Sequence, residues 1–335
     1  MSEYAIDVEH LAKKFGDFEA LKGVTLRISK GEIFGLLGPN GAGKSTTINI
    51  LLNLMDPTSG RVFVEGVDMT KEPNKAKGKI GLVTQETIIE PELTAEQNLR
   101  LFGRLYHMDE KDIDKKIDFL LALAQLTEFK KVYAGNFSGG MKRRLDTVKG
   151  LIHDPEILIL DEPTTGLDIQ NRLRIWELLK RINKERGVTI LMTTQYLEEA
   201  DAVCNRIAIM DHGKVVAMGT PSQLKQSMGR GSIIEVSAEK DALATIERIL
   251  KKETGREPTL QGSRVSVSVE KDPAKALGRV ITAMEKGRVK FDSVSIHEPT
   301  LDDVFLKLTG SSLRDSAESG GGESNRMMRI FRGGR

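Results

Sequence analysis

The sequence predicts an α/β protein with a parallel sheet core, a small antiparallel β subdomain and a helical subdomain, followed by a small C-terminal α+β domain. From about residue 155 to 220, strand-sized apolar segments alternate with helical ones, which is typical of parallel strands covered by helices. A further apolar strand, Ile33–Leu37, runs through a glycine-rich turn into a helix at Lys44–Leu54. The alternating segments are strands at Ile157–Leu160, Val188–Met192 and Ile207–Met210 and helices at 169–185 and 197–203.

Other segments extend this core on both sides. Short alternating segments from Ile6 to Ile28 predict strands of a small antiparallel sheet. Residues 94–133 have the apolar spacing of helices and lie inside a helical subdomain of about 90–150. Glycines and a proline between residues 219 and 231 indicate a boundary, so we expect one domain over 1–228 and a second over 229–310.

The second domain has the element order of a small α+β unit, which we expect to be ferredoxin-like. A closing helix within 299–310 has Thr300 as its cap and an apolar face made of Leu301, Val304, Phe305 and Leu308. The Ser/Gly-rich residues 311–335 are expected to be disordered. The other predicted elements are a strand near 232–237, a helix near 240–253, two strands near 257–269, a helix near 273–286 and a strand near 289–296.

The composition argues against several classes of protein. The 335 residues contain 50 Lys and Arg against 48 Asp and Glu, so the chain lacks the basic excess of a dedicated nucleic-acid binder. No apolar stretch approaches the roughly eighteen residues of a membrane-crossing helix, and the N-terminus has no signal-peptide pattern. Cys204 is the only cysteine, so no internal disulfide forms. We expect a cytosolic protein that does not bind nucleic acid.

A phosphate-binding loop stands between the strand Ile33–Leu37 and the following helix. Glycine lets the backbone turn so that its N–H groups face a phosphate, and the positive end of the helix points at the same anion. Lys44 adds a charge for the β- and γ-phosphates, and the Ser45 hydroxyl is a ligand for magnesium. The motif therefore predicts binding of ATP with Mg²⁺. Its residues are Gly38, Pro39, Asn40, Gly41, Ala42, Gly43, Lys44, Ser45 and the adjacent Thr46.

Two adjacent carboxylates follow the buried strand Ile157–Leu160. A strand end beside a phosphate loop is where a second magnesium contact is needed, and we expect Asp161 to make it. Glu162 is next in sequence but points elsewhere, so we expect it to polarise the water that attacks the γ-phosphate. Acidic residues also occur in ordinary turns after strands, so the catalytic interpretation depends on the pairing with the phosphate loop.

With these motifs, residues 4–220 resemble the nucleotide-binding subunits of ABC transporters. The segment Phe137–Met141 resembles the ABC signature and precedes the strand that ends at Asp161. In this family two subunits close head to tail, which implies that this segment reaches the γ-phosphate held by the partner chain through Ser138 and the N–H groups of Gly139 and Gly140. The resemblance also implies roles for Phe15 in stacking on adenine, for Gln85 in contacting magnesium and water, and for Asp168 at the dimer seam.

Two features narrow the resemblance to ATP-binding subunits of daunorubicin/doxorubicin-type drug-resistance exporters. Gln195 stands where most of the family has histidine, and Leu301–Leu306 reads Leu-Asp-Asp-Val-Phe-Leu. A glutamine amide still donates a hydrogen bond to the γ-phosphate, but it does not become cationic near neutral pH. The implied catalytic residues are therefore Glu162, Gln195 and Lys44, with catalysis depending more heavily on Glu162.

The resemblance implies an ATPase motor for export of drug-like or amphipathic compounds. Two copies, expected to be a homodimer, would bind ATP, close, hydrolyse it and reopen, and so move a separate multi-spanning membrane subunit at the inner face of the cell membrane. Two alternatives stay open. One is a soluble ABC ATPase acting on ribosomes or DNA, although the chain has one cassette and no sustained heptads. The other is a nucleotide-gated regulatory module with negligible turnover.

Overall fold

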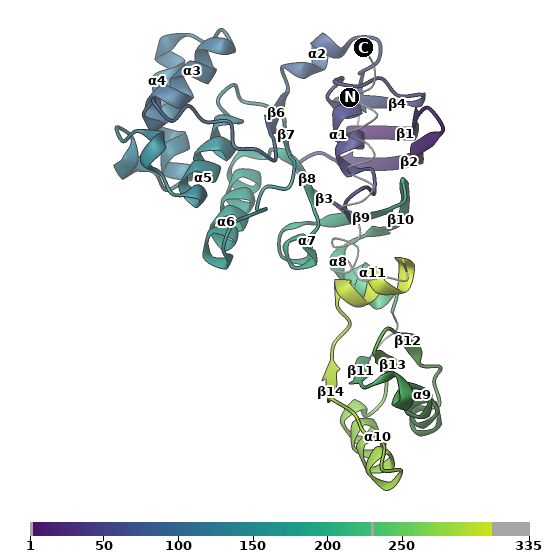
Figure 1. The fold of residues 1–335 in the computed structure, drawn as a ribbon. Coiled ribbons are helices and arrows are strands. Elements are labelled where there is room, and N and C mark those ends of the chain that lie inside the picture. The colour runs from purple at the N-terminus through teal and green to yellow at the C-terminus, as the bar shows by residue number, and fades with distance from the viewer. Residues whose placement is uncertain (1–2, 229–230, 310–335) are drawn as a thin grey trace. The chain divides into compact units, whose positions relative to one another are not determined.

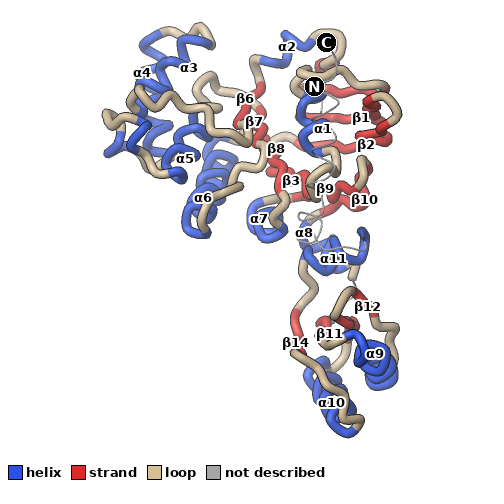
Figure 2. The backbone as a smooth tube through the Cα atoms, viewed as in Figure 1, coloured by secondary structure: helices blue, strands red, loops and turns tan. Residues whose placement is uncertain are grey.

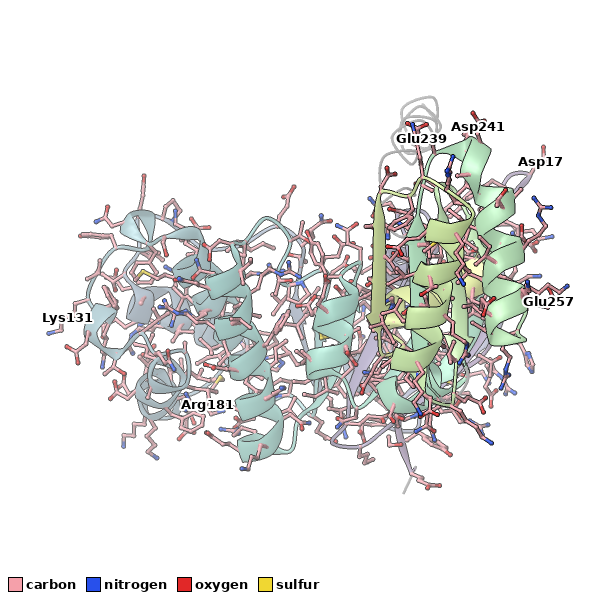
Figure 3. All side chains as sticks on the ribbon, turned by 90° about the horizontal axis from the view of Figure 1, so that it is seen from below. Asp17, Lys131, Arg181, Glu239, Asp241 and Glu257 are labelled. Atoms are coloured by element: carbon pink, nitrogen blue, oxygen red, sulfur yellow. The ribbon has the colours of Figure 1, made fainter. Side chains whose placement is uncertain are left out.

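The computed structural model describes residues 3–228 and 231–309. Contacts divide the chain into two units, one over Met1–Thr220 and a second that begins at Pro221, and both are drawn in Figure 1. Among the helices in these described ranges, none is long and apolar enough to cross a membrane. Charged side chains such as Lys131 and Glu257 stand on the outside of the units (Figure 3). The predicted disordered tail, 311–335, lies outside the described residues.

The centre of the first unit is a six-stranded sheet in the order β10-β9-β3-β8-β7-β6. The strands from β9 to β6 are parallel, and β10 is antiparallel to β9. This confirms the predicted parallel core. Because parallel strands point the same way, the residues that follow β3, β6, β7 and β8 all emerge at one edge. The strands are β3 Ile33–Leu37, β6 Ile80–Val83, β7 Ile157–Leu160, β8 Thr189–Thr194, β9 Arg206–Asp211 and β10 Lys214–Gly219.

A four-stranded antiparallel sheet, in the order β2-β1-β4-β5, shares one hydrophobic core with the central sheet. Leu26 and Val62 of the antiparallel sheet, Ile48 of α1 and Leu36 of β3 belong to the same buried cluster. Figure 2 shows how these strands, in red, lie beside the helix α1. The sequence predicted β1 and β2 but not β4 and β5. These two strands are short, and they follow the phosphate loop and α1 in the chain before they join the sheet of β1 and β2. The elements are β1 Tyr4–Phe15, β2 Phe18–Ser29, α1 Lys44–Leu51, β4 Ser59–Val64, β5 Val67–Asp68 and α2 Pro73–Lys77.

Helices occupy the rest of the first unit. α6 and α7 contact β8, and α3, α4 and α5 contact one another as the predicted helical part. Their apolar residues are buried at helical spacing, as with Ile113, Ile117 and Leu121 of α4. The elements are α3 Ala95–Leu105, α4 Glu110–Leu123, α5 Gly139–Lys149, α6 Ile169–Arg186 and α7 Leu197–Val203, with the single turns η1 Thr127–Phe129 and η2 Ala134–Asn136.

The second unit has the predicted ferredoxin-like order, with an antiparallel sheet β12-β13-β11-β14. Apolar residues of α9 and α10, such as Ile246 and Val280, form one core with Ile234 of β11. The last strand begins at Ser293, later than predicted, and Leu308 of the closing helix is 43% exposed rather than part of the buried face. The elements are α8 Pro221–Gln226, β11 Ser232–Ser237, α9 Lys240–Thr254, β12 Thr259–Gln261, β13 Arg264–Val269, α10 Pro273–Lys286, β14 Ser293–His297 and α11 Leu301–Thr309.

The fully buried Asn98 fixes the segment that leads into the helical part. Its Nδ2 donates to the carbonyl oxygens of Leu93 and Thr94. Its amide also pairs with Glu90 in both directions, because Nδ2 donates to the Glu90 carbonyl at 3.0 Å and Oδ1 accepts from the Glu90 N–H at 2.8 Å. These bonds satisfy backbone groups that would otherwise be buried without partners.

We expect Asn98→Ala to lower the free energy of unfolding by about 2–4 kcal/mol, because it leaves several backbone groups unsatisfied. The matched variant is Gln97→Ala, which removes an exposed capping box with Thr94 and should cost about 1 kcal/mol. Urea unfolding followed by circular dichroism measures both. Equal losses in the two variants would contradict the role given to Asn98.

Candidate functional site

The phosphate-binding loop runs from the end of β3 to the start of α1. Gly43 caps α1 with a φ of 104°, a left-handed conformation that glycine adopts without strain. Gly38 passes so close to Met210 that an added Cβ would collide with the Met210 carbonyl oxygen. The loop therefore needs glycine at both positions. Its backbone lies at the positive end of α1, where helix N–H groups bind anions.

The Lys44 ammonium group is buried in this loop. Its Nζ donates to the carbonyl oxygens of Gly38 at 2.7 Å and Pro39 at 3.1 Å. Nζ also lies 3.7 Å from Oε1 of Glu162. Burial lowers the pKa of Lys44, and the carboxylates of Glu162 and Asp161 act in the opposite direction. A positive charge is thus held beside the two carboxylates that follow β7.

The hydroxyl of Thr193, on the neighbouring strand β8, links those two acidic residues. Thr193 Oγ1 accepts a hydrogen bond from the Glu162 N–H at 2.9 Å and donates one to Asp161 Oδ1 at 2.5 Å. Glu162 has a φ of 45°, which is unusual for a residue with a side chain. The Thr193 bond holds this conformation, and Thr165 Oγ1 donates to Glu162 Oε2 at 3.1 Å. The two carboxylates therefore have different partners.

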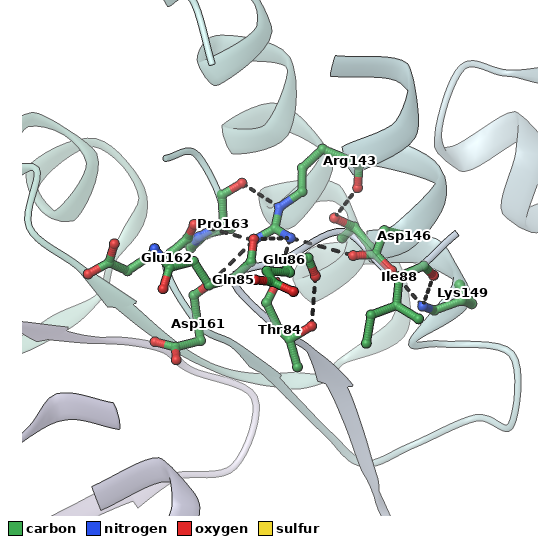
Figure 4. A network of polar contacts seen from close by, with 11 residues as sticks. Thr84, Gln85, Glu86, Ile88, Arg143, Asp146, Lys149, Asp161, Glu162 and Pro163 are labelled. Carbon is green, nitrogen blue, oxygen red and sulfur yellow. Dashed lines mark hydrogen bonds and ion pairs between the residues drawn. The ribbon is translucent and has the colours of Figure 1, made fainter. Parts of the chain in front are cut away.

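Gln85 follows β6 at the same edge of the sheet, and its backbone is linked to the end of β7 by Arg143 of α5. The Arg143 guanidinium donates to the carbonyl oxygens of Thr84 at 2.6 Å and Pro163 at 2.7 Å, as Figure 4 shows. It also donates to the Gln85 carbonyl oxygen at 3.4 Å. The Gln85 side chain itself is exposed. One buried cation thus connects the ends of β6 and β7.

The predicted signature segment begins α5, where Ser138 is the N-cap and accepts a hydrogen bond from the Met141 N–H at 3.3 Å. Gly140 packs so closely on Asn171 that an added Cβ would collide with the Asn171 amide. Asp168, the N-cap of α6, accepts from the Asn171 N–H at 2.9 Å and from its Nδ2 at 2.6 Å. These bonds lower the pKa of Asp168. The starts of α5 and α6 therefore form one continuous surface.

Gln195 is half-buried and directly follows β8, two residues after Thr193. The loop and α7 that follow are fixed by Glu199, which is fully buried and accepts a hydrogen bond from Trp176 Nε1 at 2.9 Å. Burial raises the pKa of Glu199. The Arg172 guanidinium lies 4.1 Å from the centre of the Tyr196 ring. Gln195 therefore lies in a well-packed turn between β8 and α7.

Phe15 ends β1 and is half-buried, with Lys13 Nζ 5.2 Å from the centre of its ring. Phe15 pairs with Phe18 across the hairpin. The second strand of this hairpin lies against the phosphate loop. A Cβ added at Gly43 would collide with the Leu21 side chain and would also lie close to the Ala20 carbonyl oxygen. The structure therefore places the aromatic residue on the hairpin that borders the loop.

The residues predicted to hold magnesium offer oxygen ligands of the kind that the ion prefers. The Ser45 hydroxyl comes from the first turn of α1, the Gln85 amide from the segment after β6, and the Asp161 carboxylate from the end of β7. All three segments start at the same edge of the sheet. This donor set fits Mg²⁺.

The structure brings Lys44, Asp161 and Glu162 together and places Gln85 and Gln195 after strands that end at the same edge. Ser138, Gly139, Gly140 and Asp168 lie at the starts of α5 and α6. Sequence reasoning gave no role to Thr193 or Arg143. A threonine in a strand and an arginine in a helix are common, and only the adjacency of β7 with β8 and the burial of Arg143 distinguish them.

Comparison with known proteins identifies the family of the chain. The ABC transporter family profile matches residues 21–165, and the C-terminal domain profile of DrrA1-3-like ATP-binding proteins matches residues 219–309. The daunorubicin resistance ATP-binding protein DrrA3 of Streptomyces coeruleorubidus is 40% identical, over 94% of this chain and 98% of its own. The linearmycin resistance ATP-binding protein LnrL of Bacillus subtilis is 37% identical, over 92% of this chain and 100% of its own.

Solved structures give the same answer for the fold. The cbiO1 protein of Clostridium perfringens, part of the ABC transporter complex cbiONQ, aligns with a TM-score of 0.63 and 29% identity, over 68% of this chain and 94% of its own. The dimeric ATP-binding cassette MJ0796 bound to ADP and phosphate aligns with a TM-score of 0.57 and 31% identity, over 64% of this chain and 98% of its own. The chain is therefore an ATPase that belongs to the ATP-binding subunits of ABC transporters, in the group with a DrrA-like C-terminal domain.

Proposed function

We propose that this ATPase works as a homodimer on a separate multi-spanning membrane subunit and drives export of drug-like or amphipathic compounds. The observation that carries the proposal is the cluster at the sheet edge, where Lys44 lies 3.7 Å from Glu162 and Thr193 bonds to both Asp161 and Glu162. A fixed cation beside a fixed pair of acids is suited to hydrolysis of a bound triphosphate.

The phosphate loop is the binding part of this site. The N–H groups of residues 40–46 and the positive end of α1 bind the phosphates, and Lys44 adds its charge to the β- and γ-phosphates. Phe15, on the hairpin beside the loop, stacks on the adenine ring. When bound, Mg²⁺ neutralises phosphate charge, and Ser45, Gln85 and Asp161 are the residues that hold it.

Glu162 is the catalytic base. Thr165 and Thr193 fix its side chain and its backbone, respectively, so the carboxylate keeps one orientation next to the phosphate loop. A carboxylate in this position accepts a proton from water as the water attacks the γ-phosphate. Gln195, after the adjacent strand β8, donates a neutral hydrogen bond to the same phosphate.

The dimer would form through the surface at the starts of α5 and α6. Ser138 and the N–H groups of Gly139 and Gly140 would complete the partner's site, with Asp168 at the seam. Ile169, 73% exposed, and Leu173, 47% exposed, stand one helical turn apart beside Asp168. Apolar side chains exposed next to polar caps are typical of a surface that is covered in an assembly.

A membrane partner would dock on the helical part. Ile88, three residues after Gln85, is 51% exposed, and Leu105 at the end of α3 is 63% exposed. Their apolar surfaces suit a protein partner that responds to movement of the Gln85 segment. The names of the relatives, which concern resistance to daunorubicin and linearmycin, favour an exported amphipathic cargo. The location that follows is the inner face of the cell membrane.

The central test is Glu162→Gln. Steady-state ATP hydrolysis should fall by roughly 10²- to 10⁴-fold, because the amide accepts no proton from water. ATP binding should persist, and the variant should form a dimer with ATP and Mg²⁺ that is detected by light scattering. Retained turnover would refute the assignment of Glu162, and a monomer at saturating ATP, even together with the membrane subunit, would refute the dimer.

Thr193→Val tests the link between the strands. Valine has nearly the same shape but leaves the Glu162 N–H without its partner and Asp161 without its donor, so turnover should fall roughly tenfold or more. Thr193→Ser keeps the hydroxyl and should stay within about threefold of wild type. Equal turnover of the two variants would show that the hydroxyl has no catalytic consequence.

Gln195→His tests whether the side chain at this position contacts the γ-phosphate, because it replaces a neutral amide with a group that titrates. Wild-type turnover should have no histidine-like titration from this position, whereas the variant should gain a step between about pH 6 and 7, because imidazole loses its charge as the pH rises through its pKa. Rate profiles from wild type, Gln195→His and the neutral control Gln195→Asn make the comparison. An unchanged profile for Gln195→His would contradict contact between this side chain and the phosphate.

A further inference from the structure

Arg143 is buried in the first half of α5, with 4% of its surface exposed. Its guanidinium donates to backbone carbonyl oxygens in two segments (Figure 4). From the segment after β6 these are Thr84 at 2.6 Å and Gln85 at 3.4 Å. From the segment after β7 they are Asp161 at 3.3 Å, Glu162 at 3.3 Å and Pro163 at 2.7 Å.

Most of the Arg143 guanidinium thus faces backbone carbonyl oxygens rather than a carboxylate. The acidic contact is Asp146 Oδ2, at 3.5 Å. Asp146 is also buried and accepts a shorter bond from Lys149 Nζ at 2.5 Å. Lys149 in turn donates to the Ile88 carbonyl oxygen at 2.6 Å. Three charged residues of α5 thus hold both segments, 84–88 and 161–163, against one helix.

The same helix begins at Ser138. A movement of Ser138 therefore displaces α5 as a whole, because an α-helix is stiff over a few turns. Arg143 lies between one and two turns from Ser138, and its bonds transmit the displacement to the backbones of Gln85 and Glu162. In the proposed dimer, Ser138 faces the nucleotide of the partner, whereas Gln85 and Glu162 face the nucleotide of their own chain.

We propose that Arg143 is a positioning residue that couples the two ATP sites of the dimer. Its bonds tie the position of α5, and therefore of Ser138, to the backbones of Glu162 and Gln85. This inference rests on the proposed head-to-tail dimer. Without Arg143, ATP would still close the dimer, but Glu162 and Gln85 would be poorly positioned for hydrolysis. The rate of turnover would therefore fall while ATP-dependent dimerisation is retained.

Arg144 is a matched control on the same helix. It is 6% exposed, and its guanidinium also donates to backbone carbonyl oxygens, at Ala124 (2.6 Å) and Gln125 (3.4 Å). These acceptors end α4 in the helical part and do not belong to the catalytic edge. Replacing either arginine by methionine removes a buried cation of the same size. Both variants therefore lose a buried guanidinium. They differ in which backbone segments lose their hydrogen-bond donor, namely those after β6 and β7 for Arg143 and the end of α4 for Arg144.

The experiment compares Arg143→Met and Arg144→Met in full-length protein. ATP turnover and its Hill coefficient are measured in the single variants, and ATP-dependent dimerisation is measured with each change added to Glu162→Gln. We expect Arg143→Met to lower turnover by roughly thirtyfold or more and to reduce the Hill coefficient towards one, while the dimerisation constant stays within about threefold. Arg144→Met should change turnover and dimerisation by similar factors and keep the Hill coefficient of wild type.

The inference is overturned if Arg143→Met lowers turnover and dimerisation by the same factor with an unchanged Hill coefficient. It is also overturned if the two methionine variants behave alike. Thermal unfolding checks that each variant is folded. If Arg143→Met is not, Arg143→Lys decides in its place, because it keeps the charge but offers fewer donors and should show the same separation more weakly. Failure of Glu162→Gln alone to dimerise with ATP would refute the proposed function instead.

Discussion

The sheet edge that carries Lys44, Asp161 and Glu162 depends on one electrostatic constraint, which is that a buried ammonium group stays charged beside two carboxylates. Burial works against the charge of Lys44, and the structure compensates with two loop carbonyls and the nearby Glu162. Two other features of the site keep this arrangement in place. Gly38 and Gly43 allow the loop to wrap the ammonium, and the parallel sheet delivers the acids to the same edge.

Hydrogen bonds from a neighbouring strand and from α5 set the positions of the acids. Thr193 holds Asp161 and the backbone of Glu162 from the adjacent strand, and Arg143 holds the carbonyls of the same turn from α5. Fixed hydrogen bonds of this kind cost no reorganisation during reaction, which is how preorganised sites lower a barrier. The turn after β7 is therefore held both within the sheet and from the helix that begins at Ser138.

The second unit has a core of its own, in which α9 and α10 cover one face of a four-stranded sheet. Its match to the C-terminal domain of DrrA1-3-like proteins distinguishes this group from cassettes that share only the ATP-binding part. Leu301 and Phe305 of α11 are buried, and α11 contacts α8 of the same unit. A structural role for this closing helix accounts for the burial of its apolar residues.

The sequence by itself determined the α/β class and the ATPase family, and it located the glycine-rich turn and the acids Asp161 and Glu162. These features can be recognised from short stretches of sequence. A glycine-rich turn between a strand and a helix, or an acid after a buried strand, is defined by only a few consecutive residues. The same rules located α11 but not the exposure of Leu308, and they missed β4, β5 and the late start of β14. Short strands with mixed burial have too little periodicity to be recognised.

Only the tertiary structure decided which residues hold Asp161 and Glu162. Thr193 lies 31 and 32 positions from the two acids that it contacts, and Arg143 reaches across 58 and 59 positions to the segment after β6. Such contacts depend on the order of strands in the sheet and on the seating of α5, neither of which leaves a local pattern. Hydrogen bonds to backbone carbonyls specify no residue type at the acceptor, and so no sequence motif records them.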